Sequence, residues 1–334
     1  MSTAARPAAS PTTRLGKKSP AGDVVLDYLR RQEAALLENE QAFHRGEPDA
    51  VHRMRVATRR MRSAFQSFGA VVDRAETRKL TDELKWLAGV LGQSRDAEVV
   101  TARLRTRLED TAPELLLGEI DRQLTRRTAR RQATADETVT AVLAGSRYRA
   151  LTESARLLLE RPPLTPAAEQ WAAEVLPALV ARSWRKLDRA ARTALATPVE
   201  PSESAGAAAA GSSGAPSTVP VSNGARAAAL HEVRKLAKRT RYAAEVARPA
   251  ARRKARRLGK ALHRLQHTLG AHQDTVLSRA MLRDLGAQAQ TQGRNGFTFG
   301  LWYGRDQEIA RRIEEDFPGH WQHAARPRLR RWTS

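Results

Sequence analysis

The sequence contains no cysteine among its 334 residues. Disulfide bonds, thiolate catalysis and cysteine-based zinc sites are therefore excluded. No segment approaches the roughly 18 uncharged apolar residues that a membrane-spanning helix needs. Aromatic residues make up only 5% of the chain. These absences favour a protein without membrane spans, and we expect it in the cytoplasm.

Acidic residues are also scarce. The 36 Asp and Glu residues face 58 Lys and Arg residues, which gives a formal net charge of +22 at pH 7. Most of the basic residues are arginine, whose planar guanidinium group matches phosphate oxygens through two parallel hydrogen bonds. A charge of this size and sign attracts polyanions such as nucleic acid, anionic lipid or polyphosphate.

The apolar residues recur with helical spacing along nearly the whole chain. We expect ten to twelve helices with short connections, and hence an all-α fold built from helical bundles. Breaks are predicted just after Gly92 and Gly270. The helices expected on either side of these breaks are 74–92, 94–110, 251–270 and 273–290.

Two segments have the composition of unstructured chain. Residues 1–22 are polar and basic and contain no apolar run, which predicts a disordered tail. Residues 197–224 are rich in proline, glycine, serine and alanine, which predicts a flexible insertion between helices.

The chain contains an internal repeat of two blocks. VHRMRVATRRMR at 51–62 matches LHEVRKLAKRTR at 230–241, and LGQSRD at 91–96 matches LGAHQD at 269–274. Both pairs occur in the same order and at nearly the same separation. The repeat predicts a duplicated unit of four helices, and so two bundles related by a pseudo-two-fold axis.

The first block of each copy forms an amphipathic helix with a basic face. Successive residues of a helix are about 100° apart, so cations spaced three or four residues apart share one face. Apolar residues such as Met54 and Met61 lie opposite. The residues predicted on the basic faces are His52, Arg55, Arg59 and Arg62 in the first copy and His231, Arg234, Lys238 and Arg241 in the second.

These basic faces lack the acids that normally separate cations on a solvated helix. Residues 51–62 contain no acid, and residues 230–241 contain only Glu232. Like charges one helical turn apart repel by a few tenths of a kcal/mol per pair. Because this repulsion occurs in both copies, we predict that an external anion completes the site.

Five segments together resemble the CHAD family, the conserved histidine α-helical domain. They are VHRMRVATRRMRSAF, ELKWLAGVLGQSRDAEV, LHEVRKLAKRTRYAAE, LHRLQHTLGAHQDTVL and GFTFGLWYGRDQE. The resemblance implies one domain over 23–332, with halves at about 23–145 and 146–332 that form pseudo-symmetric four-helix bundles. It also implies a basic cavity or groove that binds inorganic polyphosphate, in some members with recruitment to polyphosphate granules.

The family's binding residues are carried over only onto matching positions. Helical spacing adds three arginines from the helix before the second copy, namely Arg182, Arg185 and Arg189. The residues carried over from the family are His52, Arg55, Arg59, Arg60 and Arg62 in the first copy and His231, Arg234, Lys235, Lys238, Arg239 and Arg241 in the second.

The resemblance leaves other functions open. Binding of RNA or of DNA without sequence specificity is the main alternative, although the basic faces lack the interleaved aromatic residues of single-strand binders. A metal-dependent phosphohydrolase that uses His52 and His231 with Asp96 and Asp274 ranks lowest, because no carboxylate cluster for divalent metals is evident in the sequence. We expect Asp96 and Asp274 to cap helices. The acidic E-x-E-x-K motif of the CYTH triphosphatases, which some family members carry, is absent. We therefore predict binding without catalysis.

No cofactor or metal is expected. His263 and His267 are one helical turn apart, a spacing that transition metals can use. Because no acidic ligand accompanies them in an H-E-x-x-H pattern, we predict no metal site there.

Overall fold

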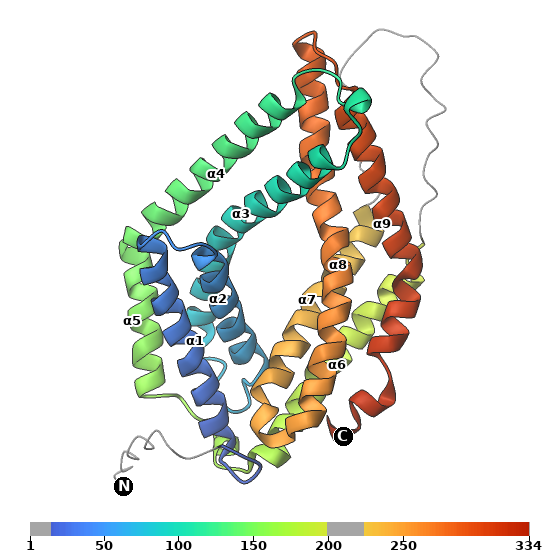
Figure 1. Ribbon diagram of the computed structural model, residues 1–334. Coiled ribbons are helices and arrows are strands. Elements are labelled where there is room, and N and C mark those ends of the chain that lie inside the picture. The colour runs from blue at the N-terminus through green and yellow to red at the C-terminus, as the bar shows by residue number, and fades with distance from the viewer. Residues whose placement is uncertain (1–14, 199–223, 334) are drawn as a thin grey trace.

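The computed structural model describes residues 15–198 and 224–333, and this part of the chain is all-helical (Figure 1). The predicted all-α class is thereby confirmed. Along the described helices, no window combines the length and the low charge of a transmembrane span. The α-helices are α1 (Ala21–His44), α2 (Ala50–Ser67), α3 (Arg78–Glu109), α4 (Ile120–Ala144), α5 (Ser146–Glu160), α6 (Ala172–Ala196), α7 (Gly224–Val246), α8 (Arg248–Thr291) and α9 (Phe297–Ala324).

The two predicted breaks are wrong, because α3 continues through Gly92 and α8 continues through Gly270. Glycine inside a helix costs about 1 kcal/mol relative to alanine. Here the packing of both helices along their whole length outweighs that cost. The irregularity of α8 lies instead near its start, where Arg252 has a φ of 40°.

Part of the segment predicted as a disordered tail is ordered. The backbone amide of Ala172 donates to the carbonyl of Ser19 at 2.8 Å, and that of Ala173 donates to Lys17 at 3.1 Å. Residues 15–22 therefore belong to the folded structure. Residues 1–14, and residues 199–223 of the predicted insertion, lie outside the described residues. A hydrogen bond links the two ends of the chain that flank the insertion, because Arg226 donates to the carbonyl of Thr197 at 2.8 Å.

In both halves of the chain, helices that follow one another in the sequence pack side by side (Figure 1). In the first half α1 packs on α2 and α2 on α3, and in the second half α6 packs on α7 and α7 on α8. Helix α5, expected at the start of the second half, packs against α1, α3 and α4 and so lies with the first half. The pseudo-two-fold relation of two four-helix bundles stays a prediction.

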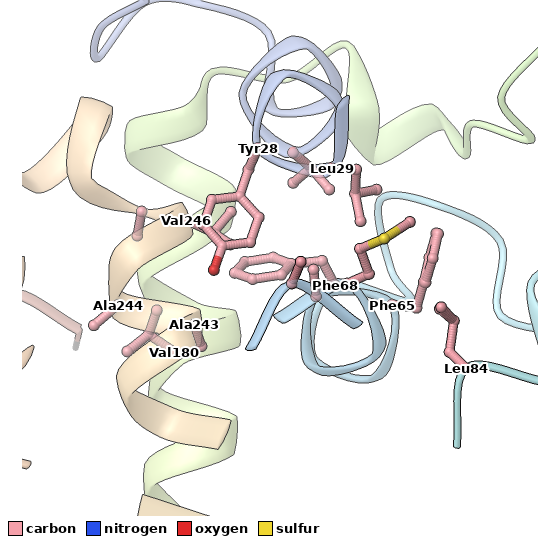
Figure 2. Packing of buried hydrophobic residues seen from close by; sticks show 14 of the residues in the cluster. Tyr28, Leu29, Phe65, Phe68, Leu84, Val180, Ala243, Ala244 and Val246 are labelled. Carbon is pink, nitrogen blue, oxygen red and sulfur yellow. The ribbon is translucent and has the colours of Figure 1, made fainter. Parts of the chain in front are cut away.

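The halves meet in two hydrophobic cores. In the larger core, Tyr28 and Leu29 of α1 and Phe68 lie close to Val180 of α6 and Ala243 of α7 (Figure 2). The smaller core joins the end of α3 and the start of α4 to the end of α8 and the start of α9. Helices α3 and α8 run from one core to the other, so the second blocks of the repeat, 91–96 and 269–274, lie in the transition between them.

A buried carboxylate ties α3 to α8 and α9 beside the smaller core. Asp306 of α9 has no solvent exposure, and it accepts hydrogen bonds from Arg103 and Arg107 of α3 and from the hydroxyl of Ser278 of α8. A buried charge is tolerated only when its partners surround it in this way. The cluster therefore fixes the distance between α3 and α8.

We predict that Asp306→Ala lowers the free energy of unfolding by about 3–5 kcal/mol, because the substitution leaves two arginines without their buried partner. Urea denaturation followed by circular dichroism measures the change. Glu308→Ala is the matched control, since Glu308 bonds to Arg311 and Arg312 on the exposed face of the same helix. Equal losses in the two variants would contradict the role assigned to the buried cluster.

Candidate anion-binding site

Four helices surround the predicted basic residues. Helix α2 contacts α3 and α7, and α8 contacts α7 and α3. Buried apolar residues set the rotation of the two motif helices: Met54 and Met61 in α2, and Val233 and Ala237 in α7. Because these side chains face the core, the basic stripes of α2 and α7 lie at the junction of all four helices.

Each block of one repeat copy lies against the other block of the same copy. A guanidinium nitrogen of Arg55 is 3.6 Å from a carboxylate oxygen of Asp96, and a Cβ atom at Gly92 would lie 3.6 Å from Arg55. The second copy repeats this arrangement around Arg234. At Gly92 the 3.6 Å separation is an ordinary contact distance, and the aspartate one turn later partly balances the charge of the guanidinium group.

The equivalent contact in the second copy is tighter. A Cβ atom at Gly270 would lie 3.1 Å from a terminal nitrogen of Arg234. Burial raises the pKa of Asp274, while the charge of Arg234 opposes that rise. The predicted capping roles of Asp96 and Asp274 are therefore wrong, because both residues lie inside continuous helices, where they accompany arginines.

The basic stripes of the two halves meet in a central cluster formed by His52, Arg55, Arg59, Arg234 and Lys238. Burial, and then the charges of Arg234, Arg59 and Arg55, lower the pKa of Lys238 to about 6. Burial also lowers the pKa values of Arg55 and Arg234. The lysine amine is consequently mostly uncharged at neutral pH, while the arginines remain cations.

The pKa of His52 is also lowered within this cluster. Burial, followed by the charges of Arg95 and Arg59, lowers the pKa of His52. Among the described residues, the buried Nδ1 atom of His52 has no hydrogen-bond partner, and neither have the Nε atoms of Arg59 and Arg234. A buried donor without a partner costs free energy. Anionic oxygens at this junction would supply the missing acceptors.

A second cluster of cations adjoins the central one. Burial, followed by the charges of Arg239 and Arg59, lowers the pKa of Arg62. Burial, followed by the charges of Arg239, Arg182, Arg74 and Arg189, lowers the pKa of Lys186. Arg239, Arg74 and Lys186 therefore lie near one another. Because each member acts on the pKa of another or is acted on by it, we group the two clusters as the basic track. From α3 to α6 the track comprises Arg95, His52, Arg55, Arg234, Lys238, Arg59, Arg62, Arg239, Arg74, Lys186, Arg182 and Arg189.

Three members of this track, Arg95, Arg74 and Lys186, are not among the predicted binding residues. Arg95 directly precedes Asp96 in the repeated LGQSRD block, so its position next to a matched residue was an available signal. Arg74 lies between α2 and α3 and carries no comparable signal. Its place in the track follows from the tertiary structure alone.

Two predicted residues share the carboxylate of Glu245 on α7. Arg60 of α2 and Arg241 of α7 each lie 3.4 Å from this carboxylate, so the contact with Arg60 joins α2 to α7. Both guanidinium groups also lie over the ring of Tyr242. One carboxylate therefore partly balances the charges of both arginines within the protein.

The remaining predicted residues lie at the exposed edge. Lys235 pairs with Glu232 on its own helix at 2.6 Å. His231 is exposed, and its Nδ1 atom lies 2.7 Å from the side-chain oxygen of Gln273. Arg185 is exposed on α6, as are Arg182 and Arg189, but it does not contribute to the shift at Lys186.

Metal-binding side chains are dispersed in the described part of the chain. No group of three or more His, Asp or Glu residues there could hold a metal ion. His263 and His267 are both exposed on α8.

Two known proteins are similar to this chain in sequence. The chain is 32% identical over 312 residues to two uncharacterised proteins of Mycobacterium tuberculosis, MT2285 of strain CDC 1551 / Oshkosh and Rv2226 of strain ATCC 25618 / H37Rv. Each alignment covers 92% of this chain and 54% of the relative, so the chain spans about half the length of these proteins.

Two solved structures are similar in fold. PptA from Streptomyces chartreusis has a TM-score of 0.68 at 24% identity, covering 91% of this chain and all of that one. The CHAD domain from the plant Ricinus communis has a TM-score of 0.66 at 23% identity, covering 96% of this chain and 97% of that one. The model of the CHAD domain family matches residues 27–283, and the chain therefore belongs to the CHAD family.

Proposed function

We propose that this protein binds inorganic polyphosphate along the basic track and does not hydrolyse it. The observation that carries the proposal is the meeting of two cationic stripes, one from each copy of the repeat, at a half-buried junction of four helices. Arg55 and Arg234, which occupy equivalent positions in the repeat, are close enough for the charge of Arg234 to lower the pKa of Arg55. A chain of closely spaced phosphates would offset the mutual repulsion of both stripes at once.

The aromatic residues near the stripes favour a phosphate chain over RNA. Phe65 and Phe68 are buried in the larger core, and Tyr242 is 1% exposed beneath two guanidinium groups. None of these three rings is free to stack on a base, whereas single-stranded nucleic-acid binders commonly use such stacking. The track offers cations without a stacking platform, which suits a ligand without bases.

The two aspartates of the track support binding over catalysis. Asp96 lies beside Arg55, and Asp274 lies beside Arg234, so each carboxylate has a cation to orient. In this role the carboxylates hold the guanidinium groups in place for the phosphate oxygens. The resemblance to CHAD proteins found with polyphosphate granules extends the proposal to recruitment of this chain to such granules in the cytoplasm.

We predict that the variant Arg55→Ala/Arg59→Ala/Arg234→Ala/Lys238→Ala loses polyphosphate binding and remains helical, since it removes the cations shared by both halves. Fluorescence anisotropy with labelled polyphosphate measures affinity, and circular dichroism measures helicity. The control Arg105→Ala/Arg122→Ala/Arg149→Ala/Arg161→Ala removes four exposed charges elsewhere. Wild-type affinity should fall steeply with salt.

The same titration separates the two ligand classes. Excess RNA should leave the binding of polyphosphate to the wild-type protein nearly unchanged. Displacement of polyphosphate by an equal concentration of RNA phosphate would overturn the preference for polyphosphate. Equal losses of affinity in the two fourfold variants would overturn the location of the site.

Binding is predicted to weaken as the pH rises from 6 to 8. The free amine of Lys238 has a pKa of about 6, and bound phosphate favours its charged form, so binding takes up a proton above that pH. For each proton taken up on binding, the affinity falls by at most roughly tenfold for each unit by which the pH rises. Isothermal titration calorimetry in buffers with different ionisation enthalpies measures this uptake.

Substitution at the same position tests the origin of the pH dependence. Lys238→Arg, which stays charged, should make the pH profile shallower and reduce proton uptake. Lys235→Arg is the control, because Lys235 is exposed and paired with Glu232. A profile in Lys238→Arg as steep as that of the wild type would rule out Lys238 as the group that titrates.

Gly270→Ala is predicted to weaken polyphosphate binding severalfold without destabilising the fold. The added methyl group would lie 3.1 Å from Arg234 and displace its guanidinium group, while alanine favours the helix by up to about 1 kcal/mol. Gly92→Ala is the matched control, because the added methyl group there lies 3.6 Å from Arg55, an ordinary contact distance. Calorimetry and urea denaturation measure both effects, and equal affinities for the two variants would contradict the proposed role of Gly270.

A further inference from the structure

A pocket of about 740 Å³ lies on another face of the molecule, between α8, the end of α9 and the 3₁₀ helix Pro327–Leu329. Helix α8 contributes Arg257, Lys260 and Arg264, which are spaced three and four residues apart. Leu265 and Leu329 give the pocket an apolar floor. Its volume falls within the range of small-molecule sites.

The other side of the pocket is also basic. The end of α9 contributes His320 and His323, and the 3₁₀ helix region contributes Arg326 and Arg328. No acidic residue lines the pocket. Five permanent cations and two imidazoles thus face a single space.

These cations lack partners within the described residues. No carboxylate there lies within ion-pair distance of the α8 cations or of Arg326 and Arg328. Arginines elsewhere on α9 behave differently, because Arg311 and Arg312 bond to Glu308. Cations one turn apart on α8 repel one another, and no carboxylate in the described part of the chain lines the pocket to offset that repulsion.

The pocket is separate from the basic track. Its α8 residues are centred about eleven positions before Gly270 and Asp274, roughly 16 Å along the helix axis. They also point in a different direction around the helix, toward α9 and the 3₁₀ helix. No residue of the pocket is among the charges that perturb Lys238 or Arg234.

We propose that this pocket is a second anion site that binds a compact oligophosphate group, either a short inorganic chain or the triphosphate of a nucleotide. Cations on two sides match the several charged oxygens of such a group better than those of a single phosphate. The volume and the apolar residues of the pocket suit a small ligand. The proposal does not depend on polyphosphate binding to the track.

Histidine resonances provide a separate reporter for each site. Titration with tripolyphosphate, and separately with ATP, should shift the imidazole signals of His320 and His323 in a saturable way. The signals of His52 and His231 report on the track in the same spectra. Single His→Gln variants assign the four signals.

Paired substitutions test which cations form the pocket. Arg264→Gln/Arg328→Gln removes one cation from each side, and the dissociation constant read at His320 and His323 should rise at least tenfold. Arg149→Gln/Arg161→Gln removes the same charge from exposed positions elsewhere and should leave it unchanged.

Each result has a definite meaning. Tighter binding of ATP identifies a nucleotide site, and equal or tighter binding of tripolyphosphate identifies a site for inorganic chains; both uphold the proposal. Absence of a saturable shift at His320 and His323, or equal dissociation constants in the two double variants, would overturn it. Failure of polyphosphate to bind the track would show only at His52 and His231.

Discussion

Repulsion between the cations of α2 and α7 is the constraint that the rest of the structure must withstand. The stripes come from opposite halves of the chain, and their central residues lie close enough for the charge of Arg234 to lower the pKa of Arg55. Apolar burial holds the helices together, because the faces opposite the stripes belong to the larger core. The ion pair of Arg60 with Glu245 adds attraction where the two helices meet.

The protein also reduces the repulsion at its source. Lys238, which lies near Arg234, Arg59 and Arg55, has its pKa lowered to about 6 and is mostly neutral until an anion arrives. Asp96 and Asp274 partly offset one arginine each. The remaining charge is carried by arginines, which keep their protons even when burial lowers their pKa values. The free site is thus less charged than its residue types suggest, and it gains charge as a polyanion binds.

The sequence was sufficient for the features that depend on periodicity. Helical spacing identified the all-α class, the basic stripe and its buried opposite face, including Met54 and Met61. It failed where a tertiary contact decides the outcome. Local sequence predicts helix ends at Gly92 and Gly270, because the arginines that lie beside these glycines come from other helices, and Arg74 has no local pattern that links it to Lys186. Similarly, the pairing of Arg60 with Glu245 depends on how α2 meets α7.

The frame around the track explains why the repulsion is not relieved by opening the structure. Helices α3 and α8 are anchored in the larger core at one end and in the smaller core at the other. Beside the smaller core, Asp306 binds Arg103 and Arg107 of α3 and Ser278 of α8, so these helices cannot separate without exposing a buried charge. The cations are consequently held close together before the ligand binds. A polyanion then gains their full attraction without paying to assemble them, which is the energetic advantage of a preorganised site.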